Sequence, residues 1–580
     1  MIPVWMITLT LITSCKKYMP ENDPITYGDA YTQTIYTDKA AYKPGDVVTF
    51  TLEGPAFKTA PKIRYRHFTQ TLSETTLSGT SWTWTAPATD FTGYMVDLYD
   101  TTGGKENVYA SIAVDVSSDW ARFPRYGFLS KFGQLTTTQT DGIVKYLSRH
   151  HINGLQFYDW TFEHHQPLAG TVANPATTWK DIANRDTYKS TVQQYITAAH
   201  SRNMKAMSYN LAYGALNDAA SAGVQDQWYM YKDQNHNTKA EFDVTPFLKS
   251  KIYLLDPGNN GWQHYLAGKN DDVYAVYPFD GFHIDQLGDW GITYNYNGGI
   301  LNVPEGFKSF INAMKTAAPT KRLVMNAVNQ YGQQNNIAQA PVDFIYTEVW
   351  GPNEGFKDLA TIIQNNDSWS GGKKTCLAAY MNYDLANNKG YFNTPAILLT
   401  DAVIFAFGGS HLELGEHMLG REYFPNENLQ MKEDLKAALV NYYDFLTAYQ
   451  NLLRDGGAFN SPTIACTNNK MTLNTWPPQS GQVSVVGKAF ANFQVLHFIN
   501  LANANSLEWR DKNGTQTTPN TINDAAINFT STRAVSKIWM ASPDVSKGVS
   551  RNIAFTQSGS NVTFTLPSLK YWDMVVVEYQ

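Results

Sequence analysis

The chain has 580 residues, of which 43% are hydrophobic and 17% are charged, a balance that excludes a disordered protein. Its length predicts about two to four domains. The formal net charge is −6, which argues against a nucleic acid as the main partner because such binding depends on clustered Lys and Arg. Aromatic residues make up 14% of the chain, which weakly favours a carbohydrate ligand because flat rings suit the faces of sugars.

Residues 1–24 resemble an export signal followed by a tether. The apolar run from Ile2 to Ser14 is shorter than the span of about 20 residues that crosses a bilayer. It ends in Leu-Ile-Thr-Ser-Cys at Cys15, which resembles a bacterial lipoprotein signal whose Cys becomes the lipidated first residue. A plain secretory signal is the alternative. We expect an exported lipoprotein of the bacterial cell envelope, attached to a membrane through Cys15.

Residues 25–118 contain short alternating runs separated by turns. Val47–Leu52 and Gly93–Tyr99 are examples of the runs, and Lys43–Asp46 and Thr101–Gly104 are turn sequences. About seven short strands in a stretch of this length predict an immunoglobulin-like β-sandwich.

Residues 119–458 alternate apolar strand-like runs with helix-length segments, which is the pattern of a parallel sheet. The helical segments include Ser190–Arg202, Phe307–Ala318 and Glu433–Leu453. The eight predicted strands are Tyr126–Ser130, Ile152–Trp160, Met204–Leu211, Gly281–Leu287, Leu323–Val328, Phe344–Trp350, Thr375–Asn382 and Val403–Gly409. Eight such units predict a (β/α)8 TIM barrel with long loops. An open doubly wound sheet is the alternative, but no Gly-rich nucleotide loop follows the first strand.

Strand-like runs return in residues 459–580, for example Phe493–Ile499 and Met574–Glu578, and predict a C-terminal β-sandwich. Cys376 and Cys466 can either form one disulfide or remain two thiols. The sequence contains neither CxxC nor HExxH, so we expect no metal and no other cofactor.

Two carboxylates occupy matched positions at the ends of the fourth and sixth predicted strands. Asp285 follows the run Phe-His-Ile, and Glu348 follows Ile-Tyr-Thr. Reactive groups of a (β/α)8 barrel lie where its strands end. A single carboxylate would more often be a helix cap, but two at matched strand ends suit a retaining glycosidase. In such an enzyme one carboxylate attacks the anomeric carbon, and the other acts first as acid and then as base.

The two roles require different surroundings, because the nucleophile must be ionised and the acid must keep its proton near neutral pH. Strand alternation places Tyr346, Glu348 and Trp350 on one side, so the rings are expected to shield Glu348. We therefore assign Glu348 as the acid/base and Asp285 as the nucleophile. His283 shares a side with Asp285 and is expected to bond to it or to a sugar hydroxyl.

Three stretches resemble glycoside hydrolase family 66, which contains dextranases and cycloisomaltooligosaccharide glucanotransferases. They are DGFHIDQLG at 280–288, YTEVW at 346–350 and LTDAVIFAFGGSHLELGEH at 399–417. The resemblance extends over most of the chain, from the N-terminal sandwich to the C-terminal one. It implies that Asp285 is the nucleophile, that Glu348 is the acid/base, and that an α-1,6-linked glucan is cleaved with retention.

Two departures from neighbouring enzymes narrow the expected activity. α-Amylase-type enzymes place an Arg two residues before the nucleophile, where this chain has His283. Cyclising members of family 66 carry a carbohydrate-binding module inserted in the catalytic region, and the barrel stretch contains no insertion of that size. We therefore expect a monomeric endo-dextranase that binds dextran and releases isomaltooligosaccharides. A cycloisomaltooligosaccharide glucanotransferase and a non-catalytic glucan-binding lipoprotein are the alternatives.

Further polar and aromatic residues at or near the strand ends are candidates for sugar contacts, and each is about equally suited to loop packing. They are Tyr158, Asp159, Trp160, Tyr209, Asn210, His283, Asn326, Trp350, Tyr380, Asn382, His411 and Glu413. His164 and His165 lie in the loop after the second strand and are candidates for the cleft wall. His411 and His417 are expected to form hydrogen bonds rather than to bind a metal.

Overall fold

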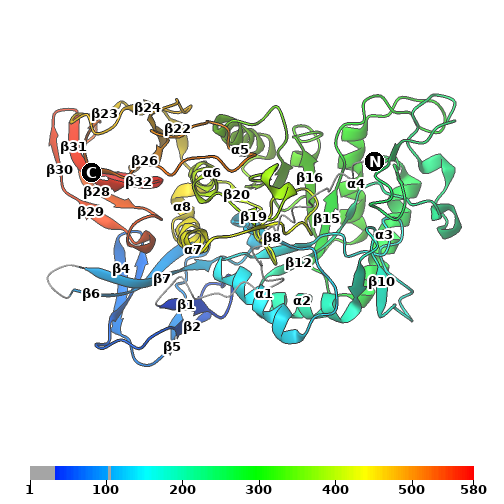
Figure 1. The fold of residues 1–580 in the computed structure, drawn as a ribbon, viewed down its shortest axis with the longest axis horizontal. Helices are drawn as coiled ribbons and strands as arrows, with labels where there is room; N and C mark the ends of the chain where they lie inside the picture. Colours follow the sequence, from blue (N-terminus) through cyan, green and yellow to red (C-terminus); the bar gives the residue numbers. More distant parts are fainter. Residues whose placement is uncertain (1–32, 102–105) are drawn as a thin grey trace, which may run out of the picture.

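The computed structural model describes residues 33–101 and 106–580. A parallel barrel occupies the centre of the molecule, and antiparallel sheets from the two ends of the chain lie together on one side of it (Figure 1). The predicted lipidation at Cys15 lies outside the described residues and stays a prediction. None of the described helices is both long and apolar enough to cross a membrane.

Seven antiparallel strands form two facing sheets near the N-terminus, which confirms the predicted sandwich. The first sheet contains β1 (Thr34–Thr37), β2 (Val47–Glu53) and β5 (Ser81–Thr85). The second contains β4 (Gln70–Thr76), β3 (Lys62–His67), β6 (Thr92–Asp100) and β7 (Asn107–Val116). The side chains of Val48, Phe50, Ile63, Val96 and Ile112 are fully buried in the shared core. Alternation of apolar and polar residues along β2 is what turns one face inward.

Eight parallel strands form the barrel, in the same order in space as in the chain. They are β8 (Tyr126–Leu129), β9 (Gly154–Phe157), β12 (Lys205–Leu211), β15 (Gly281–Asp285), β16 (Arg322–Val328), β17 (Ile345–Glu348), β18 (Thr375–Ala378) and β20 (Ser410–His411). The ring closes where the backbone N–H of Phe128 donates to the carbonyl of Leu414 at 3.1 Å. This closure brings the carboxyl ends of distant strands around one centre.

Helices surround the barrel. They are α1 (Thr137–Arg149), α2 (Lys189–Ser201), α3 (Asn260–Val276), α4 (Val303–Ala317), α5 (Phe356–Ser370), α6 (Thr394–Ala406), α7 (Glu433–Ala448) and α8 (Gln450–Leu453). A capping box between Thr136 and Gln139 starts α1, and Phe307, Phe310 and Ile311 form the buried face of α4. Short strand pairs lie in the loops: β10 (Thr178–Lys180) with β11 (Asp186–Tyr188), β13 (Glu241–Phe242) with β14 (Ile252–Tyr253), and β19 (Gly390–Tyr391) with β21 (Leu429–Gln430).

The eighth predicted strand is wrong. The first four residues of the predicted strand Val403–Gly409 form the last turn of α6, and the other three follow the helix. The eighth strand is Ser410–His411. Every residue of α6 is buried, so its apolar run has no amphipathic period and resembles a buried strand. Gly408, with φ of +85°, makes the turn between helix and strand.

Strands near the C-terminus form two further sheets that face each other, as predicted. One contains β22 (Ala458–Asn460), β24 (Leu473–Thr475), β25 (Val483–Ala489), β26 (Phe493–Asn500), β28 (Val535–Ala541), β29 (Arg551–Ile553) and β32 (Trp572–Tyr579). The other contains β23 (Ile464–Cys466), β27 (Ile522–Thr530), β30 (Phe555–Ser558) and β31 (Asn561–Leu569). Cys376 lies buried in the barrel and Cys466 in β23, and both are free thiols.

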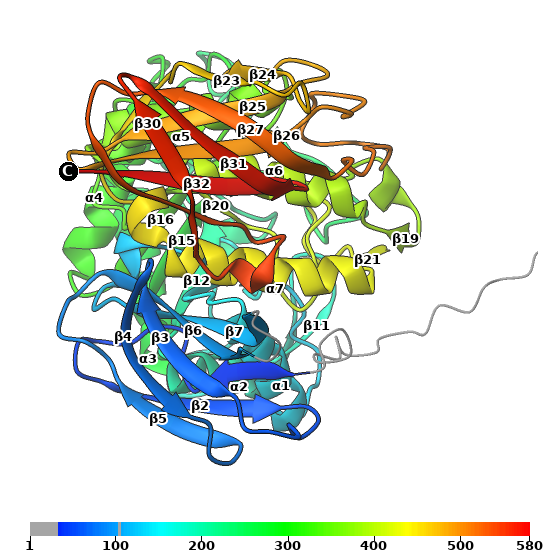
Figure 2. The same cartoon turned by 90° about the vertical axis from the view of Figure 1, so that its left-hand side faces the viewer.

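Helix α7 lies between the N-terminal and C-terminal sheets (Figure 2). Its buried Asp444 accepts hydrogen bonds from the backbone N–H of Ala113 at 2.9 Å and from Arg149 Nη1 and Nη2 at 3.0 and 2.9 Å. Nε2 of His151 lies 2.7 Å from the same carboxylate. Burial alone would raise the pKa of Asp444, but Arg149 and His151 lower it to about 2. One carboxylate thus joins strand β7, helix α1 and helix α7.

We expect Asp444→Asn to destabilise the fold by about 3–5 kcal/mol, because it removes the buried negative charge that the Arg149 guanidinium contacts. The measurement is urea unfolding at pH 7, with the exposed Asp434→Asn of the same helix as the control. The pKa of Asp444 is lower in the folded than in the unfolded protein. Its contribution to the free energy of unfolding is therefore present above the ordinary Asp pKa and disappears as the pH falls towards about 2. Equal stability of the two variants would contradict this role.

Candidate active site

Asp285 ends β15 and Glu348 ends β17, and Asn326 lies on β16 between them. Nδ2 of Asn326 donates to Oδ1 of Asp285 at 2.8 Å and to Oε2 of Glu348 at 2.9 Å. Because both hydrogen bonds start from the same nitrogen, the distance between Oδ1 of Asp285 and Oε2 of Glu348 cannot exceed the sum of the two. That limit is shorter than the separation of about 6.5–9.5 Å between the carboxyl groups of inverting glycosidases. One amide therefore holds two carboxyl groups side by side at the carboxyl ends of three adjacent strands.

Asp285 accepts two side-chain hydrogen bonds. The phenol of Tyr209, on β12, donates to Oδ2, and Asn326 donates to Oδ1. Burial raises the pKa of Asp285 above its ordinary value, and these two donors and the backbone N–H of Gln286 offset part of that rise. Donors aimed at a buried carboxylate favour its charged form.

The surroundings of Glu348 favour its protonated form. Burial and the negative charge of Asp285 raise the pKa of Glu348 to about 7, against the effect of Asn326, Tyr380 and Trp350. The Tyr380 phenol donates to Oε1 at 2.9 Å, and the ring of Trp350 lies 5.5 Å from that of Tyr380. Burial and the charge of Asp285 both oppose ionisation of Glu348, so Glu348 keeps its proton near neutral pH. Asp285 accepts hydrogen bonds from Tyr209 and Asn326 and is the group that ionises first.

His283 lies below the carboxylates among aromatic rings. Its ring is stacked near Tyr126 at 5.7 Å and Tyr209 at 5.5 Å, and it meets Tyr346 edge-on at 4.9 Å. Its Nδ1 lies 3.3 Å from the Tyr126 hydroxyl, and burial lowers its pKa to about 3. His283 is therefore a neutral part of the barrel core, and its hydrogen-bonding partner is the Tyr126 hydroxyl rather than Asp285. The predicted contact of His283 with a sugar stays a prediction.

Tyr158 and Asp159 lie near enough to Asp285 for its negative charge to contribute to the raised pKa of each. The ring of Tyr158 stacks on Phe424 at 4.2 Å and lies 5.0 Å from the ring of Tyr209. Asp159 has a left-handed backbone with φ of 50°, a conformation that is uncommon for residues other than Gly and that Asp adopts more readily than most. Burial, with smaller effects of neighbouring acids that include Asp285, raises its pKa to about 7. Both side chains remain partly exposed and thus available to a ligand.

Three predicted sugar contacts are packing residues instead, each at most 1% exposed. Trp160 lies against Phe279 in the core, with ring centroids 5.1 Å apart. Oδ1 of Asn210 lies 2.7 Å from Nδ1 of His164, and its Nδ2 donates to the carbonyl of His164 at 2.8 Å. Nδ2 of Asn382 donates to the carbonyl of Asp511 at 2.8 Å. Their side chains have no free polar atoms facing the strand ends, which corrects these assignments.

His411 and Glu413 also lie away from the carboxylate pair, in a buried network between β20, α6 and α7. His411 Nε2 lies 2.8 Å from the carbonyl of Ala379, and its Nδ1 lies 2.8 Å from Asp401 Oδ1. Tyr443 donates to Glu413 at 2.9 Å. Asp401, His411 and Glu413 lie close enough to hold a cation. Burial, however, raises the pKa of Glu413 to about 8 and that of Asp401 well above its usual range, so protons neutralise the group.

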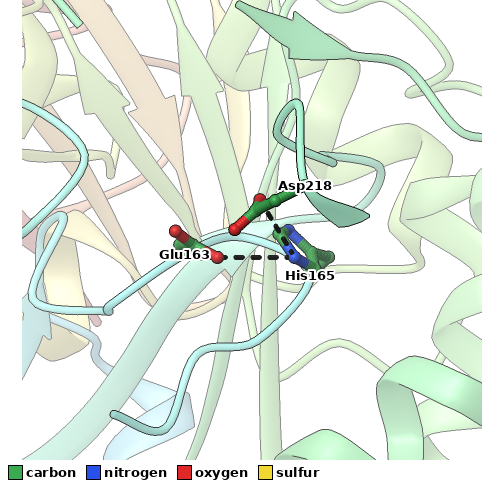
Figure 3. A group of neighbouring side chains, drawn as sticks. All are labelled: Glu163, His165 and Asp218. Atoms are coloured by element: carbon green, nitrogen blue, oxygen red, sulfur yellow. Dashed lines mark ion pairs between the residues drawn. The ribbon is translucent and has the colours of Figure 1, made fainter. Parts of the chain in front are cut away.

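A second group with ligand-like spacing joins the loops after β9 and β12 (Figure 3). Nε2 of His165 lies 3.4 Å from Glu163 and 3.7 Å from Asp218. The backbone N–H of Leu216 donates to Nδ1 of His165 at 3.4 Å, so the proton of the neutral ring is on Nε2, where a metal would have to bind. Lys249 lies 3.4 Å from Glu163 and already supplies a positive charge. The donor set therefore fits a hydrogen-bonded ion cluster rather than a metal centre.

Arg510 supports the site from the C-terminal part of the chain. This buried side chain donates to the carbonyls of Val349 at 2.7 Å and Tyr380 at 3.1 Å. Its guanidinium lies 5.2 Å from the ring of Trp350. No local sequence signal connects residue 510 to strands more than a hundred residues earlier, so only the tertiary structure identifies it.

The chain is similar to known proteins over most of its length. A family model described as glycosyl hydrolase family 66 matches residues 37–576. A cycloisomaltooligosaccharide glucanotransferase of Niallia circulans is 27% identical over 733 residues, covering 100% of this chain and 75% of that protein. A dextranase of Streptococcus salivarius is 25% identical over 569 residues, covering 84% and 68%.

A solved structure is also similar over nearly the whole chain. The crystal structure of a Paenibacillus sp. cycloisomaltooligosaccharide glucanotransferase complexed with cycloisomaltoheptaose has a TM-score of 0.85 at 27% identity. The match covers 94% of this chain and 100% of that one. The family model matches nearly the whole chain, and the fold is similar to that of a solved structure over nearly its whole length. This chain therefore belongs to glycosyl hydrolase family 66.

Proposed function

We propose that this chain is a retaining endo-dextranase, which cleaves α-1,6-glucosidic bonds of dextran and releases linear isomaltooligosaccharides. The observation that carries the proposal is the amide of Asn326 shared by Asp285 and Glu348. A retaining mechanism needs its carboxyl groups about 5–5.5 Å apart, with no room for a water between nucleophile and sugar. The names of the relatives supply the substrate class.

In the first step, the ionised Asp285 attacks the anomeric carbon, and Glu348 gives its proton to the O6 oxygen of the leaving sugar. The products are a β-glucosyl ester on Asp285 and the free leaving chain. In the second step, Glu348 takes a proton from water, which attacks the same carbon and releases Asp285. Formation of the ester removes the negative charge of Asp285, which together with burial raises the pKa of Glu348. The pKa of Glu348 then falls, so the same residue becomes the base.

A transglycosylase of the same family is the second candidate, because the same carboxylates would serve a sugar acceptor in place of water. The glucanotransferase relatives align over 733 and 738 residues, more than the 580 residues of this chain. They therefore contain inserted segments that this chain lacks, which favours the hydrolase.

The deciding measurement is product analysis after incubation with dextran, pullulan, starch and cellulose. We expect reducing ends and linear isomaltooligosaccharides from dextran alone. Cyclic products from dextran would make the chain a transferase, and activity only on another glucan would change the substrate. Retention on dextran without any release of reducing ends would indicate a glucan-binding protein.

Substitution of the two carboxylates tests their separate roles. Glu348→Gln should lower kcat on dextran by about 10²- to 10⁴-fold, the usual contribution of a general acid. It should lower turnover of α-isomaltosyl fluoride less, because fluoride leaves without a proton. Asp285→Ala should be inactive on both, and azide should restore turnover of the fluoride with the inverted β-azide as product.

The exposed Glu433→Gln serves as the matched control and should retain full activity on both substrates. An Asp285→Ala variant that folds and still cleaves dextran would refute the assignment of the nucleophile.

The pH profile provides an independent test of the acid. The alkaline limb of kcat/KM should lie at about 7, where free Glu348 loses its proton. Tyr380→Phe removes a donor that stabilises the charged form, so this limb should move to higher pH. Tyr126→Phe, which removes the hydroxyl that lies 3.3 Å from Nδ1 of His283, should leave the limb in place. A shift to lower pH in Tyr380→Phe would contradict the assignment.

A further inference from the structure

The loops that follow β12 and β15 form one wall beside the nucleophile. At its base, the backbone N–H of Ala212 donates to the carbonyl of Asp285 at 2.8 Å, and the N–H of Leu287 donates to the Tyr213 hydroxyl at 2.8 Å. Farther out, Tyr231 and Tyr294 exchange backbone hydrogen bonds at 2.8 and 2.9 Å. The two loops are therefore joined from the strand ends outward, on the side of the barrel away from the C-terminal sheets (Figure 1).

An open pocket of about 370 Å³ lies in this wall. Its lining includes Asp226, His236, Asn237, Glu241, Tyr253 and Tyr296. His236 and Tyr296 come from different loops, yet their rings are stacked with centroids 4.2 Å apart and planes 19° apart. The pocket thus combines flat aromatic faces with carboxylate, amide and hydroxyl groups.

The segment that carries His236 is held in place by its own hydrogen bonds. The carboxylate of Asp233 accepts from the backbone N–H groups of Asn235 at 3.0 Å, Asn237 at 3.2 Å and Thr238 at 2.9 Å. Little ordering is then required of this segment when a ligand binds.

The charges of the pocket are compensated within the protein. Lys239 donates to Asp226 at 2.7 Å, and Lys251 donates to Glu241 at 3.1 Å. Compensated charges do not favour an ionic ligand. A neutral polyhydroxyl ligand instead gains both hydrogen bonds from the polar groups and contact between its C–H faces and the rings.

We propose that this pocket is a second glucan-binding site, which holds glucose units of the substrate chain outside the reacting subsites. The substrate class rests on the proposed function. A polymer held in this wall, whose base is bonded to Asp285, has a raised effective concentration at the catalytic carboxylates. A substrate too short to reach the pocket gains nothing from it.

The test combines a binding and a kinetic measurement. Binding is measured by native electrophoresis in gels containing dextran, in a Glu348→Gln background that leaves the polymer uncut. Adding His236→Ala and Tyr296→Ala should weaken retention about tenfold, since each lost aromatic contact contributes a few-fold. Tyr296→Phe keeps the ring and should bind nearly as the parent does. Asn297→Ala, an exposed neighbour outside the pocket lining, is the matched control.

The kinetic measurement uses the native carboxylates. The double variant should raise KM for dextran and leave kcat/KM for isomaltotriose within twofold. Unchanged retention, or equal losses on dextran and isomaltotriose, would overturn the proposal. If the native chain cleaves no dextran, electrophoresis still decides: weaker retention in the double variant supports the pocket although the enzymatic proposal fails, and no retention of the parent overturns both.

Discussion

Two carboxyl groups that would repel each other if both were charged are held together by one amide nitrogen. Asn326 donates to Asp285 and to Glu348, and it can do so because it lies near the end of β16, between the strands that Asp285 and Glu348 end. The shared donor fixes their separation, and the separation makes the charge of Asp285 a cause of the raised pKa of Glu348. Acid and nucleophile are therefore distinguished by a single geometric constraint together with burial.

The rest of the molecule maintains this constraint. Tyr209 and Tyr380 contact one carboxyl group each, and the neutral His283 fills the space below with aromatic neighbours. Arg510 holds the loop carbonyls next to Glu348 from the C-terminal part of the chain, and Asp444 joins the N-terminal sheet to the barrel helices. The antiparallel sheets thus contribute to the active site by positioning its loops and helices.

The predictions that were confirmed rest on periodicity. Period-two alternation identified the sandwiches, and the spacing of apolar runs identified seven of the eight barrel strands. The eighth failed because α6 is buried on all sides, and a helix without a polar face carries no periodic signal. Trp160, Asn210 and Asn382 failed for a related reason. Position at a strand end does not tell whether the side chain faces the barrel mouth or the surrounding helices and loops.

The sequence by itself determined the class of fold, the strand-end positions of Asp285 and Glu348, and the resemblance to a glycosidase family, because these depend on local pattern. Only the tertiary structure decided which polar residues meet. Asn326 as a shared donor, Arg510 as a distant support and the stacked His236–Tyr296 pocket all join segments that are separate in the chain. Their contacts, and the pKa shifts that burial produces, exist only after the barrel closes, since neither proximity nor desolvation is encoded in any single segment.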